Sequence, residues 1–247
     1  MALARLLKYK KSLRPARLDI ASTYVPTYHG IHDFPISIRT YERPEYLLYT
    51  INSLKAAGIK MGLIHLFDDC SKSQKKINLL RDLEKQGIHV HRAPRRLGDR
   101  ASRINLWRRT FNMYPKTDII GDFEDDIQVS SRLIQHINNV RHIPPMGLIS
   151  LFNFTADSDP KGYVEVNRKF PGPALIITRN LYLKSQTGLR EEYGASQKKS
   201  DRMIGKWCQA AGLKALIIAP SVVQHIGEMS TQWKRRKGKA RTPVVIK

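Results

Sequence analysis

Four acidic residues lie within five positions near the middle of the chain, shortly after a pair of isoleucines. They are Asp122, Glu124, Asp125 and Asp126. Acids are scarce elsewhere, because the chain holds 21 Asp+Glu against 43 Lys+Arg. Neighbouring carboxylates repel one another, and a hard divalent cation such as Mg²⁺ or Mn²⁺ relieves that repulsion. The segment 118–130 therefore predicts a metal site at the end of a short strand, with a solvated acidic turn as the alternative.

The elements before and including this segment alternate between strand and helix. Apolar–polar alternation and short apolar runs predict strands at 34–40, 61–67, 88–91 and 118–123. Apolar residues at helical spacing predict helices that begin at Pro44, before Ile77 and at Asp99, with Asp99 as a cap. Strands that alternate with helices form right-handed βαβ units, so we expect an α/β fold whose mostly parallel sheet is flanked by helices.

The second half of the chain carries fewer clear elements. We expect helices from Leu133 to Val140 and over 203–211, and strands at 148–152, 172–178 and 215–219, the last of these being the final strand. The polar segment 190–200 is a candidate mobile lid.

Three polar loops follow three of the expected parallel strands. They are Thr40–Arg43, Asp68–Ser71 and Glu124–Asp126. In a parallel sheet these loops meet at one edge, where ligands of open α/β folds bind. The sequence thus places the acidic cluster in a ligand site rather than on an arbitrary surface.

Composition limits the class of protein. At 247 residues and 41% hydrophobic content the chain forms one large domain, or one domain with appendages. No run of about 18 apolar residues is present, so we expect no membrane span, and the basic first 18 residues lack the apolar stretch of a secretory signal. Cys70 and Cys208 are too few for a disulfide framework and are expected to be small apolar side chains in a reducing cytoplasm.

The net charge of +22 predicts a polyanionic partner, either nucleic acid, an anionic membrane face or an acidic glycan. The alternative is a basic surface that serves solubility alone. Basic residues concentrate in the segments 1–18, 91–110 and 234–247. The candidate contacts to a polyanion are Arg95, Arg96, Arg100, Trp233, Lys234, Arg235 and Arg236. Trp233 lies beside the basic run and could stack on a base or a sugar.

Five short motifs occur in a fixed order along the chain. They are Ser37–Pro44, Asp68–Ser71, Glu124–Asp126, Ser200–Asp201 at a helix start, and Pro220–Gly227. In this order they resemble the GT-A glycosyltransferases, the nucleotide-sugar-dependent class with a Rossmann-like amino-terminal half. The resemblance covers about 34–231 and implies a basic arm at 1–32, a GT-A domain at 33–231 and a basic tail at 232–247. Cys70 stands where related enzymes usually have glycine, and the DXD-type metal motif begins with Glu124 instead of aspartate.

The resemblance implies roles for individual residues. Asp126, Glu124 and His225 would hold Mn²⁺ or Mg²⁺ against the diphosphate of a nucleotide sugar, expected to be a UDP-sugar. The donor pocket would comprise Thr40, Arg43, Asp68, Asp69, Arg103, Glu124 and Asp125. Asp201 would act as the general base of an inverting transfer.

Some of these residues also have structural interpretations. Asp201 could serve as a helix N-cap, and His225 could be a structural histidine. For Asp125 we expect an outward-facing carboxylate rather than direct metal ligation.

The charge suggests the acceptor, since a sugar-transfer domain alone does not need +22. DNA carrying 5-hydroxymethylpyrimidines, as bacteriophage DNA glycosyltransferases use, would supply both a hydroxyl and a polyanion. The alternatives are a lipopolysaccharide or capsule transferase at the cytoplasmic membrane face and a non-catalytic nucleic-acid-binding module. We expect a cytoplasmic location, in the host cytoplasm if the protein is viral.

Overall fold

The computed structural model describes residues 34–143, 145–153, 159–166, 171–191 and 200–227. Its first half alternates strand and helix as expected. The elements are β1 (Ile36–Thr40), α2 (Pro44–Ala56), η1 (Met61–Leu63), β2 (Ile64–Asp68), α3 (Gln74–Lys85), β3 (His89–Arg92), α4 (Asp99–Met113) and β4 (Ile119–Glu124). Proline occupies the first turn of α2, where its missing N–H costs no hydrogen bond. Ser73 caps α3 by accepting a hydrogen bond from the backbone N–H of Lys76.

The second half adds strands of both directions to the same sheet. Its elements are β5 (Ile127–Val129), α5 (Leu133–Val140), β6 (Met146–Ser150), β7 (Tyr163–Val166), β8 (Ala174–Thr178), α6 (Arg179–Glu191), α7 (Ser200–Ala210), β9 (Lys214–Ile218) and β10 (Val223–His225). The large sheet has eight strands in the order β3-β2-β1-β4-β8-β6-β9-β7. β3, β2, β1 and β4 are parallel to one another, and β8 pairs antiparallel to both β4 and β6. β5 and β10 form a separate antiparallel pair.

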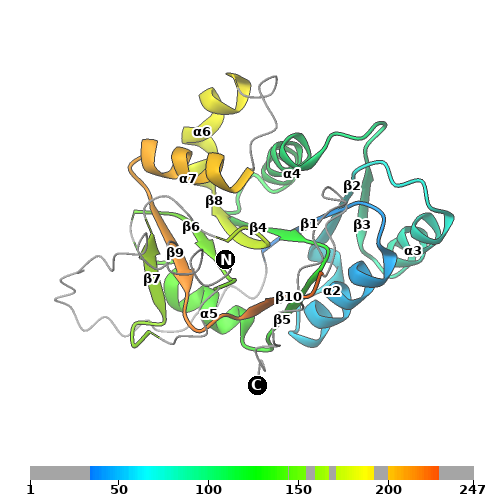
Figure 1. Cartoon of the computed structure of the whole chain (residues 1–247), viewed down its shortest axis with the longest axis horizontal. Coiled ribbons are helices and arrows are strands. Elements are labelled where there is room, and N and C mark those ends of the chain that lie inside the picture. The colour runs from blue at the N-terminus through cyan, green and yellow to red at the C-terminus, as the bar shows by residue number, and fades with distance from the viewer. Residues whose placement is uncertain (1–33, 144, 154–158, 167–170, 192–199, 228–247) are drawn as a thin grey trace, which may run out of the picture.

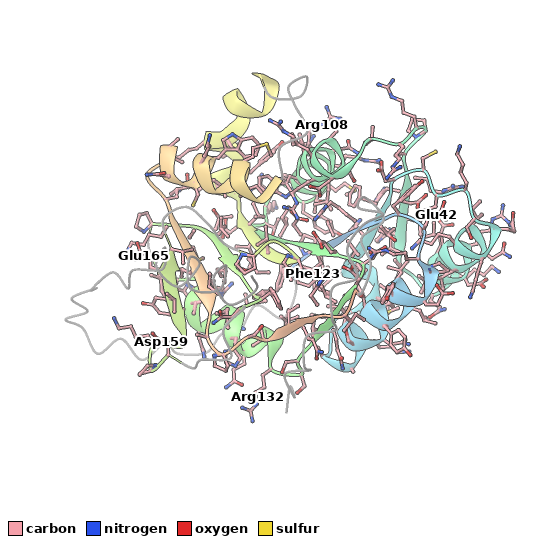
Figure 2. The ribbon with its side chains drawn as sticks, in the orientation of Figure 1. Glu42, Arg108, Phe123, Arg132, Asp159 and Glu165 are labelled. Atoms are coloured by element: carbon pink, nitrogen blue, oxygen red, sulfur yellow. The ribbon has the colours of Figure 1, made fainter. Side chains whose placement is uncertain are left out.

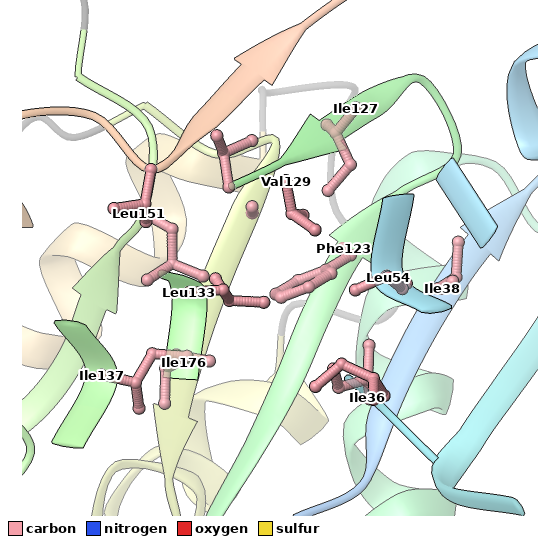
Figure 3. Close-up of a cluster of buried hydrophobic side chains, with 14 of the residues drawn as sticks. Ile36, Ile38, Leu54, Phe123, Ile127, Val129, Leu133, Ile137, Leu151 and Ile176 are labelled. Carbon is pink, nitrogen blue, oxygen red and sulfur yellow. The ribbon is translucent and has the colours of Figure 1, made fainter. Parts of the chain in front are cut away.

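Helices cover both faces of the sheet, as Figure 1 shows. Side chains of α2, α3 and α5 pack on one face with the core of β1, β4 and β8. Figure 3 shows Phe123 between Ile36, Ile38 and Leu54 on one side and Leu133 and Ile176 on the other. On the opposite face, α4, α6 and α7 enclose a second core that contains the fully buried Trp107. Each helix therefore packs an apolar face on the sheet, and this packing holds in place the strands whose ends carry the polar loops.

Several expectations for the second half were wrong. The sequence analysis did not predict α6, β5 or β7, and β10 follows the strand that was expected to be final. The first two residues of the candidate lid belong to α6, and positions 192–199 lie outside the described residues.

Asp99 does not cap α4, because Gly98 holds the N-cap position and the Asp99 carboxylate pairs with Arg39 at 2.6 Å. The basic arm at 1–32, with Arg5 to Arg17, and the basic tail at 232–247 lie outside the described residues.

No helix among the described residues is long and apolar enough to cross a membrane.

Candidate metal and donor site

Glu124, Asp126 and His225 meet at the carboxyl end of β4. Glu124 ends β4, Asp126 lies in the turn to β5, and His225 ends β10. The pairing of β10 with β5 places His225 opposite Ile127, and the N–H of Ile226 donates to the backbone oxygen of Asp126 at 2.8 Å. One ligand atom from each of the three residues lies within 4.8 Å of the others. A segment a hundred residues away along the chain therefore completes a group that the acidic motif begins.

The donor atoms of this group suit a divalent metal. His225 Nε2 lies 3.2 Å from Asp126 Oδ1 and 3.8 Å from Glu124 Oε2. Asp126 Oδ1 is buried, and no donor among the described residues meets it with hydrogen-bond geometry. A buried carboxylate oxygen without a hydrogen bond is costly unless a cation lies beside it, and at this position the cation is either a protonated His225 or a bound metal. Two carboxylates and an imidazole are ligands that Mn²⁺ and related cations accept, so these residues fit the metal that the resemblance implies.

The three groups influence one another's protonation. Burial raises the pKa of Glu124 to about 7, and the neighbouring Asp126 carboxylate adds to the effect, against the pull of Arg39. For Asp126, burial would raise the pKa, but close contact with His225 and Arg43 lowers it to about 2. For His225, burial alone would lower the pKa, but Asp126 and Glu124 raise it overall. Asp126 is thus ionised at neutral pH and can serve as a ligand without losing a proton.

Buried arginines already relieve part of the repulsion among the acids. Asp122 is fully buried; it pairs with Arg39 Nε at 3.1 Å and Arg103 Nε at 3.1 Å, and it accepts from Trp107 Nε1 at 2.8 Å. The same two arginines reach Glu124 Oε1, at 3.2 Å from Arg39 and 3.7 Å from Arg103. Charge clustering is therefore the weaker argument for a metal, and the convergence on His225 is the stronger one. Arg103 was expected in the donor pocket; it lies beside Glu124 but is itself only 1% exposed.

Asp125 does not face outward, so that expectation was wrong. Asp125 is only 2% exposed, and its backbone oxygen accepts from the hydroxyl of Thr50 at 2.9 Å. Its carboxylate accepts from Thr40 Oγ1 at 2.6 Å and from Arg43 Nη2 at 2.6 Å. Thr40 is also buried, so neither side chain presents a free surface to a donor.

Asp68 and Asp69 are likewise buried and engaged in the fold. Asp68 accepts from the N–H and hydroxyl of Ser71 and pairs with Arg92 Nε at 3.1 Å. Asp69 accepts from the backbone N–H groups of Leu97 and Gly98, at 2.6 and 2.9 Å. The two acids thus hold the loops of the predicted donor pocket. In the same loop, Cys70 has a φ of 64°, in the left-handed region that favours glycine.

Among the described residues predicted to contact a polyanion, Arg95 and Arg96 are exposed and Arg100 is half-buried. The guanidinium of Arg96 lies 4.3 Å from the centre of the Tyr41 ring, beside the donor loops. Trp233, Lys234, Arg235 and Arg236 lie outside the described residues. Asp201 lies in the first turn of α7, as expected for a helix start, but its side chain is outside the described part of the structure. Its assignment as general base stays a prediction.

The sequence analysis did not single out Arg39 or Lys76 as parts of the site, and it named Asp122 only as one acid of the cluster. Lys76 is fully buried in α3, donates to Thr40 Oγ1, and lies 3.9 Å from Asp125 Oδ2. Burial lowers the pKa of Lys76 to about 8, although Asp125 opposes that shift. For Asp122 a signal was present, since an acid in the middle of an apolar strand needs a buried partner. Lys76 follows Gln74 and Lys75 and gives no such signal.

Comparison with known proteins finds similarity of fold and not of sequence. The sequence matches no protein-family model, and no curated protein matches it. One structure similar in fold is the mannosyltransferase PcManGT from Pyrobaculum calidifontis in complex with GDP-Man and Mn²⁺. Its TM-score is 0.57 at 14% identity, and the match covers 89% of this chain and 62% of that one.

Two structures of TarS from S. aureus are also similar. One has a TM-score of 0.55 at 11% identity and covers 77% of this chain and 36% of that one. The other, TarS 1–349 in complex with UDP-GlcNAc, has a TM-score of 0.53 at 12% identity and covers 80% and 61%. The chain thus spans less than two thirds of each of these structures.

The fold is of the GT-A type. The eight-stranded, mostly parallel sheet with flanking helices confirms the expected fold class, and the structures of similar fold include a mannosyltransferase with GDP-Man and Mn²⁺ and TarS with UDP-GlcNAc. Identities of 11–14% support similarity of fold alone.

Proposed function

We propose that this chain is a metal-dependent glycosyltransferase that moves a sugar from a nucleotide-sugar donor to a hydroxyl group of a polyanionic acceptor. The observation that carries the proposal is the convergence of Glu124, Asp126 and His225 at the carboxyl edge of the parallel strands of a GT-A-type sheet. Ligands of such sheets bind at this edge. A non-catalytic module would have no need for three metal-ligand side chains there.

The residues around this group suit transfer from a diphosphate donor. A bound Mn²⁺ or Mg²⁺ would stabilise the negative charge that builds on the leaving diphosphate. Asp126, with Glu124 and His225, would hold it, while Arg39 and Arg103 fix the Glu124 carboxylate from the protein side. Asp201, at the start of α7, is the proposed general base that takes the proton of the attacking hydroxyl. Direct attack by the acceptor would invert the configuration at the anomeric carbon.

We infer a UDP-sugar as donor, with Mn²⁺ as the metal. Support comes from the structures of similar fold, of which one holds UDP-GlcNAc and another holds GDP-Man with Mn²⁺. The nucleobase would lie near the loops that Asp68 and Asp69 hold in place, beside Tyr41 and Arg96. Because those two carboxylates are already bonded, they would shape this pocket more than they would contact the base.

For the acceptor we propose 5-hydroxymethylpyrimidine bases in DNA, of the kind found in bacteriophage genomes. The supporting observation is the net charge of +22, together with exposed Arg95 and Arg96 next to the donor loops. The modified base would leave the stack to bring its hydroxyl to the sugar. Such an enzyme would act in the cytoplasm, or in the host cytoplasm for a viral protein.

A panel of radiolabelled nucleotide sugars, incubated with Mn²⁺ and duplex DNA that contains 5-hydroxymethylcytosine or 5-hydroxymethyluracil, tests this proposal. Unmodified DNA of the same sequence is the control. The proposal predicts label in the modified duplexes alone. Donor hydrolysis without labelled DNA would contradict the DNA acceptor and direct attention to lipopolysaccharide or capsule acceptors at an anionic membrane face. No donor consumption under any condition would contradict the transferase itself.

A further inference from the structure

A lysine without contact to solvent lies directly beneath the acidic loop. Lys76 is fully buried in the first turn of α3, where its ammonium group donates to Thr40 Oγ1 and lies 3.9 Å from Asp125 Oδ2. A buried ammonium is costly to desolvate, and lysine is among the residues least often found in this state. The fold therefore places a buried positive charge immediately below the loop that carries the proposed metal ligands.

Lys76 begins a chain of charge-assisted hydrogen bonds that ends on a proposed ligand. Thr40 Oγ1 accepts from Lys76 and donates to Asp125 Oδ2 at 2.6 Å. The other oxygen of Asp125 accepts from Arg43 Nη2 at 2.6 Å, and Arg43 Nη1 donates to Asp126 Oδ2 at 2.7 Å. Arg43 thus bridges the two neighbouring carboxylates, and Asp125 holds one end of its guanidinium. Bonds of this kind are shorter and stronger than neutral hydrogen bonds.

The backbone that carries Arg43 is strained and firmly held. Glu42 and Arg43 have φ angles of 52° and 45°, a left-handed conformation that residues with a side chain rarely adopt in succession. The N–H of Glu42 donates to Ser71 Oγ at 2.8 Å, and its carboxylate accepts from the N–H of Lys72 at 2.7 Å. Figure 2 shows Glu42 on the side of the molecule that α2 and α3 form. The strand-to-helix loop is therefore fastened to the start of α3, the helix that supplies Lys76.

This arrangement leaves Asp126 with one oxygen for a metal. Arg43 occupies Oδ2, and the backbone of Gly227 packs against the same oxygen, since a Cβ there would lie 2.1 Å from it. Oδ1 faces His225 and Glu124 and has no hydrogen bond of good geometry among the described residues. Groups that orient a ligand in this way commonly govern metal affinity although they do not touch the metal.

We propose that Lys76 and Asp125 are positioning residues that act through Thr40 and Arg43 to fix Asp126 as a one-oxygen metal ligand. The inference rests on the proposed metal site. It gives Asp125 a different role from the donor contact that the motif suggests. It also assigns a function to Lys76, whose buried side chain cannot contact a nucleotide sugar or an acceptor molecule.

The direction in which Mn²⁺ affinity changes when Lys76 is replaced distinguishes this positioning role from a simple charge effect. Removing a nearby positive charge would tighten the binding of a divalent cation if Lys76 acted only through its charge. If Lys76 positions Asp126, its loss weakens binding, by about 10- to 100-fold on the scale of ligand-orienting residues. The experiment measures Mn²⁺ affinity by electron paramagnetic resonance in the full chain and in Lys76→Met. Lys75→Met is the matched control, because Lys75 is the preceding residue, is exposed, and pairs only at the surface with Glu45.

We expect weaker Mn²⁺ binding in Lys76→Met and unchanged binding in Lys75→Met. Unchanged or tighter binding in Lys76→Met would overturn the positioning role. Should Lys76→Met not fold, Thr40→Val breaks the same chain of bonds without a change in charge or much change in volume, and Thr40→Ser restores the hydroxyl. Weak binding in Thr40→Val with recovery in Thr40→Ser supports the proposal, and equal binding in both overturns it.

The outcome also separates this inference from the proposed function. Absence of Mn²⁺ binding in the unaltered chain would contradict the metal site and the inference together. Mn²⁺ binding that depends on Lys76, in a chain that consumes no nucleotide sugar, would uphold the positioning role and contradict the transferase. In a working transferase, the loss of turnover caused by Lys76→Met should diminish at saturating Mn²⁺. The loss of turnover caused by removing a group that acts only in the transition state would remain at saturating Mn²⁺.

Discussion

Replacement of Gly227 by alanine should damage the metal site while sparing the fold. Gly227 follows β10, and a Cβ built on it would lie 2.1 Å from Asp126 Oδ2 and 2.8 Å from its Cγ. Real Cβ atoms essentially never approach another heavy atom within 3.0 Å, so the carboxylate must move by about 0.9 Å. The backbone cannot simply slide away, because the N–H of Ile226 donates to the backbone oxygen of Asp126 at 2.8 Å.

A shift of this size is large for a metal ligand. Misplacement by about 1 Å can cost a reaction about 100-fold, and disturbed ligand orientation costs about 10- to 100-fold in metal affinity. We therefore expect Gly227→Ala to weaken Mn²⁺ binding, and with it donor turnover, by about 10- to 100-fold on that scale. Titration of Mn²⁺ monitored by electron paramagnetic resonance measures this directly, with thermal unfolding as the check on the fold.

Gly62→Ala is the matched control, since nothing lies within 4 Å of a Cβ at that position. It should leave Mn²⁺ affinity and unfolding unchanged. Normal Mn²⁺ affinity in Gly227→Ala would refute the geometry, because it would mean that Asp126 Oδ2 does not lie against the Gly227 backbone in the working site.

Three further predictions concern the base, the tail and a histidine cluster. Asp201→Asn should lose about 100-fold or more in turnover while keeping donor affinity; near-normal turnover would exclude it as the base. Deletion from Trp233 onward should reduce the salt dependence of DNA binding, because each phosphate contact adds about one unit to the slope of log K against log salt, and an unchanged slope would assign the tail another role. Burial lowers the pKa of His65 to about 3, with help from the neighbouring His89 and His91, so this ring is neutral in the fold and the unfolded chain takes up the proton near pH 6.5. The stability of the chain relative to a His65→Phe variant should therefore be constant above pH 6.5 and fall by up to about 1.4 kcal/mol per pH unit below it; urea unfolding at pH 7.5 and pH 5 measures the difference, and equal differences at the two pH values would contradict the neutral ring.

The first half of the fold was predictable because its signals are local. Pro44 starts α2, Gly58 with a φ of 80° follows its end, and apolar residues recur at helical spacing between them. The second half was harder to predict because its strands are short or irregular. β5 and β10 have three residues each and pair with one another across almost a hundred positions, which no local pattern reveals.

The acids of the candidate site were predictable, together with Arg43 and Arg103, but two of the cations that pair with those acids were not. Carboxylates that follow strands point to the sheet edge, so the motif around Asp126 could be placed from sequence. The partners of these acids come from distant elements, such as Arg39 in β1 and Lys76 in α3. Asp125 was misjudged for the same reason, because its neighbours in sequence do not reveal that Arg43 and Thr40 cover it. Long-range ion pairs of this kind become visible only when the topology is known.

The central claim is that Glu124, Asp126 and His225 hold a divalent metal that supports cleavage of a nucleotide sugar. The most direct measurement is the release of nucleoside diphosphate from UDP-sugars and GDP-sugars by the full chain, with Mn²⁺ and with a chelator, beside an Asp126→Ala variant. The account predicts release that requires Mn²⁺ and disappears in Asp126→Ala, with DNA binding retained. Release that persists in chelator or in the variant would contradict the metal site.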